Sequence, residues 1–233
     1  MILTLDRAAG DTATEIEPIE DKFEAFIEAA DFPCVGAKSA SARGNLTMVR
    51  ARDLRSGWND LEIHERLMDW AAAHGEDDGA LHSFAVLFAG PDDLNEDEFE
   101  RLMWERIQSF ADKDAWLGQR YASTVSRDPQ DPHFALSFGG KAFFAVGLHP
   151  HASRPARRFA HPAIVFNPHD QFERLREQNR YGRMREAIMA RDAKLAGSTN
   201  PMLADHGEAS AAPQYSGRQV SGDWKCPFRD KRS

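Results

Sequence analysis

Two histidines in the C-terminal half of the chain have the chemistry and the placement of metal ligands. His149 follows directly on the apolar run AFFAVGL, at the expected end of a strand. His169 is expected as the second residue of a helix that begins at Pro168, and it shares the inward face of that helix with Phe172. The positive end of a helix dipole disfavours imidazolium, and neutral imidazole is the form that ligates metal. Both histidines also have a structural interpretation, in which loop carbonyls cap His149 and His169 forms a hydrogen bond across the core.

Three arginines in the proline-containing loop SRPARR (153–158) form a candidate anion site. They are Arg154, Arg157 and Arg158. Guanidinium groups pair bidentately with carboxylates and phosphates, whereas a lysine ammonium acts as a point charge. Residues 150–191 hold nine arginines and no lysine. For the arginines after residue 170, a solvated helical face is an equally good interpretation.

The two cysteines each lie beside a proline. Cys34 follows Pro33, and Cys226 precedes Pro227. Lone cysteines often act as small buried apolar residues, but a cysteine next to proline near a C-terminus can also present a thiolate ligand. The sequence contains no Cys-x-x-Cys or His-Glu-x-x-His pattern and no glycine-rich loop of the Rossmann or P-loop type. These motifs therefore give no sign of a zinc site or of a nucleotide-binding core.

The segment 200–220 combines acidic and basic side chains in irregular backbone. It contains Asp205, Glu208, Tyr215 and Arg218. Loops that carry both charges on a rigid scaffold are typical of binding sites. A merely solvated loop is the alternative. From spacing alone, these features indicate a histidine-liganded metal site or an anion site, without defining a reaction.

Bulk properties limit the class of protein. The chain has 233 residues and a formal net charge of -8, so it has no general attraction to nucleic acid or to an anionic membrane. No apolar run approaches the roughly 20 residues that span a bilayer. We see no signal peptide at the N-terminus, and two cysteines do not make a disulfide framework. We therefore expect a cytoplasmic protein.

Hydrophobic periodicity predicts helices and strands in an irregular order. Two apolar runs around Gly139-Gly140 predict a β-hairpin. The expected strands are 44–54, 81–90, the two arms of 132–148, and 163–166; the expected helices are 20–34, 56–75, 95–118, 167–178 and 180–197. Without regular βαβ alternation, this order predicts an α+β fold with a mixed, largely antiparallel sheet flanked by helices. We expect a flexible leader over 1–18 and a single domain over 19–233.

Five ordered sequence blocks resemble the YqcI/YcgG family. The blocks are FPCVGAK (32–38), FFAVGLHPHASRPARRF (143–159), VFNPHDQFERLR (165–176), GSTNPMLADHGEAS (197–210) and QYSGRQV…WKCPF (214–228). Relatives in this family include haem-dependent N-oxygenases that hydroxylate the guanidine nitrogen of arginine or of a hydroxylated arginine, in guanitoxin and D-cycloserine biosynthesis. The resemblance implies haem b as the cofactor, dioxygen as a co-substrate and an external electron donor.

The resemblance also suggests roles for individual residues. His149 or His169 would be the axial ligand of the haem iron, with Cys34 and Cys226 as weaker candidates. The three arginines of the SRPARR loop would neutralise the haem propionates.

The remaining candidates would act on the substrate. Asp205 and Glu208 would bind its guanidinium group, while Arg218 would bind its α-carboxylate and Tyr215 would contact it. Two alternatives remain at this stage. One is a haem carrier or sensor without oxygenase activity, and the other is a non-haem site that uses His149, His151 and His169 together. The sequence also leaves open whether the chain forms a homodimer.

Overall fold

A single five-stranded sheet organises the protein. The computed structural model describes residues 17–73, 79–202 and 207–232. The strands are β1 (Leu46–Asp53), β2 (Ser83–Gly90), β3 (Leu136–Phe138), β4 (Lys141–Leu148) and β5 (Ala163–Pro168), in the order β1-β2-β5-β4-β3. Strands β1 and β2 are parallel, and every other neighbouring pair is antiparallel. The predicted mixed, largely antiparallel sheet is therefore confirmed, with β5 as its middle strand.

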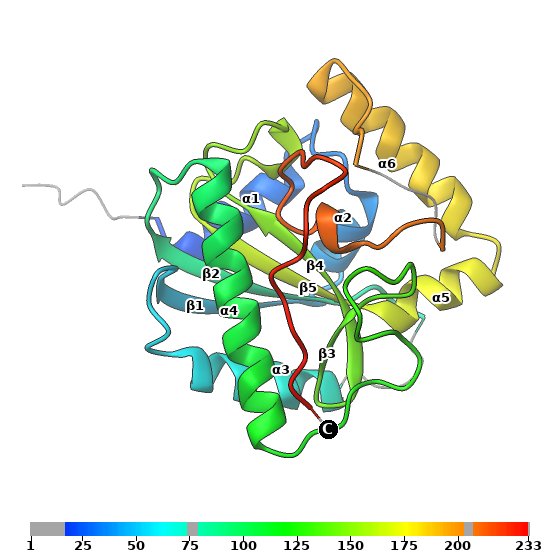
Figure 1. Ribbon diagram of the computed structural model, residues 1–233. Coiled ribbons are helices and arrows are strands. Elements are labelled where there is room, and N and C mark those ends of the chain that lie inside the picture. The colour runs from blue at the N-terminus through cyan, green and yellow to red at the C-terminus, as the bar shows by residue number, and fades with distance from the viewer. Residues whose placement is uncertain (1–16, 74–78, 203–206, 233) are drawn as a thin grey trace, which may run out of the picture.

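Helices cover both faces of this sheet (Figure 1). The helices in the described residues are α1 (Ile19–Glu28), α2 (Val35–Ala42), α3 (Asp60–Ala73), α4 (Glu96–Trp116), α5 (His169–Glu177) and α6 (Tyr181–Ala196), with short 3-10 turns at Pro155–Arg157 and Ala212–Gln214. Helices α3 and α4 pack on one face and α1 on the other, while α6 packs against α2 and α5. The α+β class is confirmed.

Alternation along the strands divides the core into two layers. On β2, Phe84 and Val86 point toward α3 and α4, whereas Ala85 and Leu87 point toward α1. These four side chains are completely buried. Full burial of a large apolar side chain stabilises the fold by about 1.5–3 kcal/mol. A strand that is covered on both faces needs apolar side chains at every position, and the continuous apolar run of β2 supplies them.

The long helix α4 (Glu96–Trp116) lies within the predicted range 95–118. The Asn95 side chain accepts a hydrogen bond from the Glu98 amide, and the Glu98 carboxylate accepts one from the Asn95 amide. This capping box satisfies two of the amides that a helix start leaves unpaired. Gly118 follows the helix with a φ of +71°.

The glycine pair forms the predicted hairpin between β3 and β4. Gly139 and Gly140 have φ values of +57° and +75°, as a two-residue turn with two positive φ angles requires. Because β3 has only three residues, the edge of β4 beyond it is open to other chain segments. There the amide of Gly147 donates to the carbonyl of Tyr215 at 2.7 Å, so the C-terminal part of the chain continues this edge of the sheet.

The structure corrects the expected start of α5. We expected a helix over 167–178 with Pro168 as its first residue, but β5 extends through Pro168 and the helix begins at His169. Asn167 and Pro168 still pair with β4 in the sheet. The Asn167 side chain accepts from the Ser83 hydroxyl at 2.7 Å instead of capping the helix. Strand pairing across the sheet thus prevailed over local cap chemistry.

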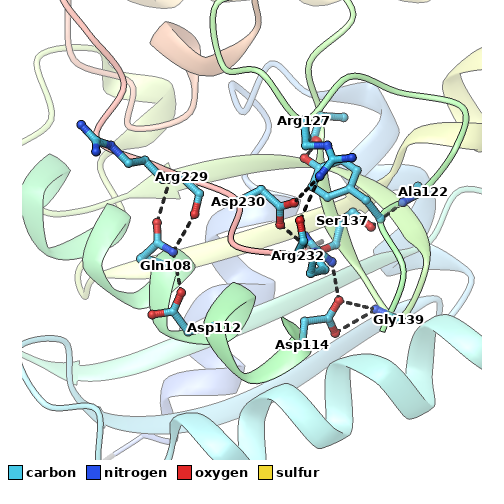
Figure 2. Close-up of polar contacts among 12 residues, drawn as sticks. Gln108, Asp112, Asp114, Ala122, Arg127, Ser137, Gly139, Arg229, Asp230 and Arg232 are labelled. Atoms are coloured by element: carbon cyan, nitrogen blue, oxygen red, sulfur yellow. Dashed lines mark hydrogen bonds and ion pairs between the residues drawn. The ribbon is translucent and has the colours of Figure 1, made fainter. Parts of the chain in front are cut away.

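The C-terminal segment runs along α4 and is held by a buried polar cluster (Figures 1 and 2). Arg232 donates to Asp114 on α4 and to Asp230 beside it, both at 2.6 Å. The Gln108 side chain exchanges two hydrogen bonds, each of 2.9 Å, with the backbone of Arg229. No helix of the described residues is long and apolar enough to cross a membrane. The predicted leader over 1–18 lies outside the described residues, except for residues 17 and 18.

Candidate functional site

Two neighbouring cavities lie between the sheet and the outer helices α5 and α6. The outer cavity has a volume of about 540 Å³ and the inner cavity about 260 Å³. They share wall residues from β4, α5 and α6, namely Phe144, Phe172, Met184 and Ile188. Together the cavities have the size and the mostly apolar walls that are typical of small-molecule and cofactor sites.

Helix α6 forms the outer wall of both cavities. The apolar residues of α6 form one stripe of Tyr181, Met184, Ile188 and Leu195, and the first three line the outer cavity. These side chains are only partly buried. The stripe therefore faces open space, and a ligand between α6 and the sheet would complete its burial.

Cys34 lines the inner cavity at the start of α2. Its Sγ accepts a hydrogen bond from the Ala37 amide at 3.4 Å, so the side chain acts as the cap of this helix. Burial raises the pKa of the Cys34 thiol, and the Ala37 and Gly36 amides partly oppose that rise. The Cys34 Sγ, a soft ligand atom, is thereby held at the apolar wall of the inner cavity. The two amide dipoles favour its thiolate form.

Arg157 places a positive charge in the same wall. Its guanidinium donates to the carbonyls of Gly147, Tyr215 and Gln214 at 2.9–3.2 Å. Among the described residues it forms no ion pair with a carboxylate. Desolvation lowers the pKa of Arg157 to about 10, so the side chain remains a cation at neutral pH. A partly buried cation whose hydrogen bonds go to backbone carbonyls is a good binding group for an anion.

The other two arginines of the loop are already engaged. Arg154 also lines the inner cavity, where it forms an ion pair of 2.5 Å with Asp192 of α6. Arg158 is exposed and donates to the carbonyls of Ala152 and Ser153 in its own loop. The structure therefore brings Arg154, Arg157 and Cys34 together and leaves Arg158 outside.

His169 lies at the rim of the outer cavity, in the first turn of α5. Its side chain is 21% exposed, and Nδ1 lies 3.7 Å from a carboxylate oxygen of Glu173. The same carboxylate pairs with Arg176 at 2.5 Å. His169 is thus a partly exposed imidazole in the wall of the outer cavity.

His149 lies away from both cavities, on the α4 side of the sheet. Its ring stacks on Phe99 of α4, with 4.3 Å between centroids, and only 1% of the residue is exposed. Desolvation lowers the pKa of His149 to about 4, so its imidazole is neutral. The structure does not bring His149 and His169 into one site.

The residues expected to bind substrate are also dispersed. Arg218 donates to Glu100 of α4 from Nε at 2.6 Å and from Nη2 at 3.1 Å, so an internal carboxylate already occupies it. Tyr215 is completely buried and forms part of the wall of the outer cavity. Glu208 is exposed, next to a glycine of the cavity wall. Asp205 lies outside the described residues.

The alternative of a non-haem metal site built from His149, His151 and His169 is wrong. Within residues 17–73, 79–202 and 207–232, no group of three or more His, Cys, Asp or Glu side chains is arranged to hold a metal ion. His151 is exposed on the loop after β4, while His149 is buried beneath α4. These two and His169 therefore do not form a common site.

Sequence reasoning missed three residues that shape the site region. Glu100 and Asp192 are acids in helices whose partners, Arg218 and Arg154, are far away in the sequence. Gln171 of α5 exchanges hydrogen bonds with the backbone of His82 and so docks that helix against the chain before β2. No local pattern marks such pairings, because each depends on how helices pack on the sheet.

The fold and the cavities define an α+β protein with one mixed sheet and a ligand-sized apolar space beneath its outer helices. The chain belongs to the YqcI/YcgG family, which it matches over residues 23–229. No curated protein and no solved structure matches the chain.

Proposed function

We propose that the two cavities bind a haem b, and that the protein is a haem-dependent monooxygenase of an amino-acid-like substrate. The hydroxylated atom would be a nitrogen, with the guanidine group of arginine or a derivative as the first choice. The observation that carries the proposal is the chemistry of the inner cavity. Its apolar walls hold one thiol, Cys34, and one partly buried cation, Arg157, which forms no ion pair with a carboxylate of the described residues.

The residues present fit a haem in their donor chemistry. Cys thiolate and His imidazole are both axial ligands of haem iron, and Cys34 and His169 lie at the inner and outer cavities respectively. Arg157 would bind a propionate. His149 does not fit, because its ring is enclosed by α4 and lines neither cavity.

Bound haem would supply oxidation of the substrate nitrogen by dioxygen and two electrons. The chain's own residues would prepare the space. The amides of Ala37 and Gly36 would partly offset the burial that favours the neutral Cys34 thiol, and the apolar stripe of α6 would exclude water. The charge of Arg157 would fix the orientation of the acidic edge of the porphyrin.

Substrate and partners follow from the same proposal. Asp192 and Glu173 at the cavities are already paired with Arg154 and Arg176, so Glu208 and Asp205 stay our candidates for binding a guanidinium. We also propose an external electron donor, a cytoplasmic location and a homodimer.

A haem carrier or sensor without oxygenase activity is the second candidate. The cavity carboxylates Asp192 and Glu173 are both engaged in ion pairs, and this favours the second candidate. A carrier does not bind a positively charged substrate, so it needs no unpaired carboxylate in the cavity. Reductant-dependent oxygen consumption with arginine analogues separates the two functions. A sensor consumes oxygen at the same rate with and without the analogue, whereas the monooxygenase does not.

The deciding experiment is a hemin titration of the purified chain, followed by its absorption spectrum. We expect a Soret band that saturates at one hemin per chain. Cys34→Ala and His169→Ala test the ligand, and His149→Ala is the control that should leave the band unchanged. If neither test variant alters the band, both ligand assignments fail. If the wild-type chain stays colourless with hemin, the proposed function fails.

A further inference from the structure

Three aromatic rings connect the outer cavity with the surface along α4. Tyr215 stands in the wall of the outer cavity and stacks on Trp104, with 5.7 Å between ring centroids and 25° between ring planes. The ring of Trp104 lies 6.4 Å from that of Trp224. Trp104 and Trp224 both line a surface groove of about 720 Å³. The three rings therefore form a continuous row from cavity to groove.

The row passes around the open edge of the sheet. Tyr215 lies beside β4 where the short β3 has ended, since its carbonyl accepts from the Gly147 amide. On the cavity side, its ring meets Phe144 at 4.9 Å between centroids. On the other side it meets Trp104, which belongs to α4. The edge position lets one aromatic row connect two sides of a molecule that the sheet otherwise separates.

The two tryptophans differ in the hydrogen-bond acceptor available to the indole N–H group. Trp104 is 2% exposed, and its Nε1 has no hydrogen-bond partner among the described residues. The Nε1 of Trp224 donates to the Glu100 carboxylate at 2.7 Å. An indole that has lost an electron becomes a strong acid, so a nearby carboxylate stabilises the oxidised state by accepting its proton. When one electron is removed from the row, the oxidised residue would therefore be Trp224.

We propose that Tyr215, Trp104 and Trp224 form a one-electron relay that discharges oxidising equivalents from the cavity to the surface. The inference rests on the proposed haem function. In one cycle, an electron leaves Trp224 and passes through Trp104 and Tyr215 to a one-electron oxidant formed from dioxygen or peroxide in the cavity. The Nε1 proton of Trp224 moves to Glu100.

A soluble one-electron reductant in the groove then completes the cycle. It returns one electron to Trp224, and the proton returns from Glu100 to the indole nitrogen. Each cycle thus reduces the oxidant by one electron and oxidises the reductant by one. The relay would protect the cavity lining whenever an oxidant forms without substrate.

The test uses the full chain loaded with hemin and mixed with hydrogen peroxide in the absence of substrate. Rapid freezing and electron paramagnetic resonance detect the radical, and ring-deuterated tryptophan distinguishes an indole radical from a phenoxyl radical. We expect a deprotonated indole radical in the wild-type chain and its loss in Trp224→Phe. Trp116→Phe is the matched control, because Trp116 is 79% exposed and lies outside the row. Glu100→Gln should shift the radical to its protonated form.

The outcomes separate the relay from the haem proposal. If hemin binds and Trp224→Phe keeps the wild-type indole signal, the relay is overturned and the haem function stands. Trp104→Phe gives a second, independent test, since it interrupts the row while Trp224 and Glu100 remain; an unchanged Trp224 signal there also overturns the relay. If the wild-type chain takes up no hemin, both proposals fall.

Discussion

Removal of the Arg232 side chain tests how the C-terminal segment is held on the fold. Its guanidinium is 4% exposed and donates to Asp114, which is fully buried, and to Asp230 (Figure 2). Breaking a buried ion pair by removing one partner costs about 3–5 kcal/mol. Asp114 would keep its bonds to His64 at 2.8 Å and to the Gly139 amide at 3.0 Å. We therefore expect Arg232→Ala to cost about 3 kcal/mol, the lower end of that range.

Urea unfolding at pH 7 measures this loss as a change in the free energy of unfolding. Lys231→Ala is the neighbouring control, because the Lys231–Asp112 pair is mostly exposed and should contribute less than about 1 kcal/mol. Asp114→Asn combined with Arg232→Ala should recover part of the loss, since an amide no longer leaves a charge unpaired. Equal losses for Arg232→Ala and Lys231→Ala would refute the argument.

Three further changes test other parts of the structure. Burial holds the pKa of His149 at about 4 against about 6.5 in the unfolded chain, so the unfolded chain gains a proton first and stability falls as pH drops from 6.5 toward 4. His149→Gln should remove up to about 3 kcal/mol of that acid-induced loss, measured by urea unfolding at pH 7 and pH 4.5. In Gly147→Ala the new Cβ would lie 2.8 Å from the Met103 sulfur, so we expect a loss of about 1–3 kcal/mol and a lower Tm. Gly182→Ala, where nothing lies within 4 Å, should leave the Tm unchanged or raise it. Asn95→Ala removes the capping box of α4 and should cost about 1 kcal/mol in thermal unfolding, and an unchanged Tm would show that the cap does not stabilise the helix.

Local patterns were sufficient where one segment alone decides the conformation. The two positive φ angles of the hairpin follow from Gly139-Gly140, and the limits of α4 follow from Asn95 and Gly118. Helix α2 escaped prediction because VGAKSASA is made of small residues without an apolar stripe, and its cap is a cysteine. At Asn167, a good cap residue was used for sheet pairing instead. Local chemistry is thus decisive only where no long-range partner competes with it.

The site shows the same division more strongly. The sequence by itself determined the strands, most of the helices and a group of arginines, histidines and cysteines with suitable chemistry, because those properties belong to single residues and their neighbours. Only the tertiary structure decided that Cys34 and Arg157 share a cavity while His149 lies under α4. Which side of a sheet a residue faces, and which distant carboxylate neutralises a guanidinium, depends on how helices pack on that sheet. Residues 118 positions apart, such as Glu100 and Arg218, meet only through that packing.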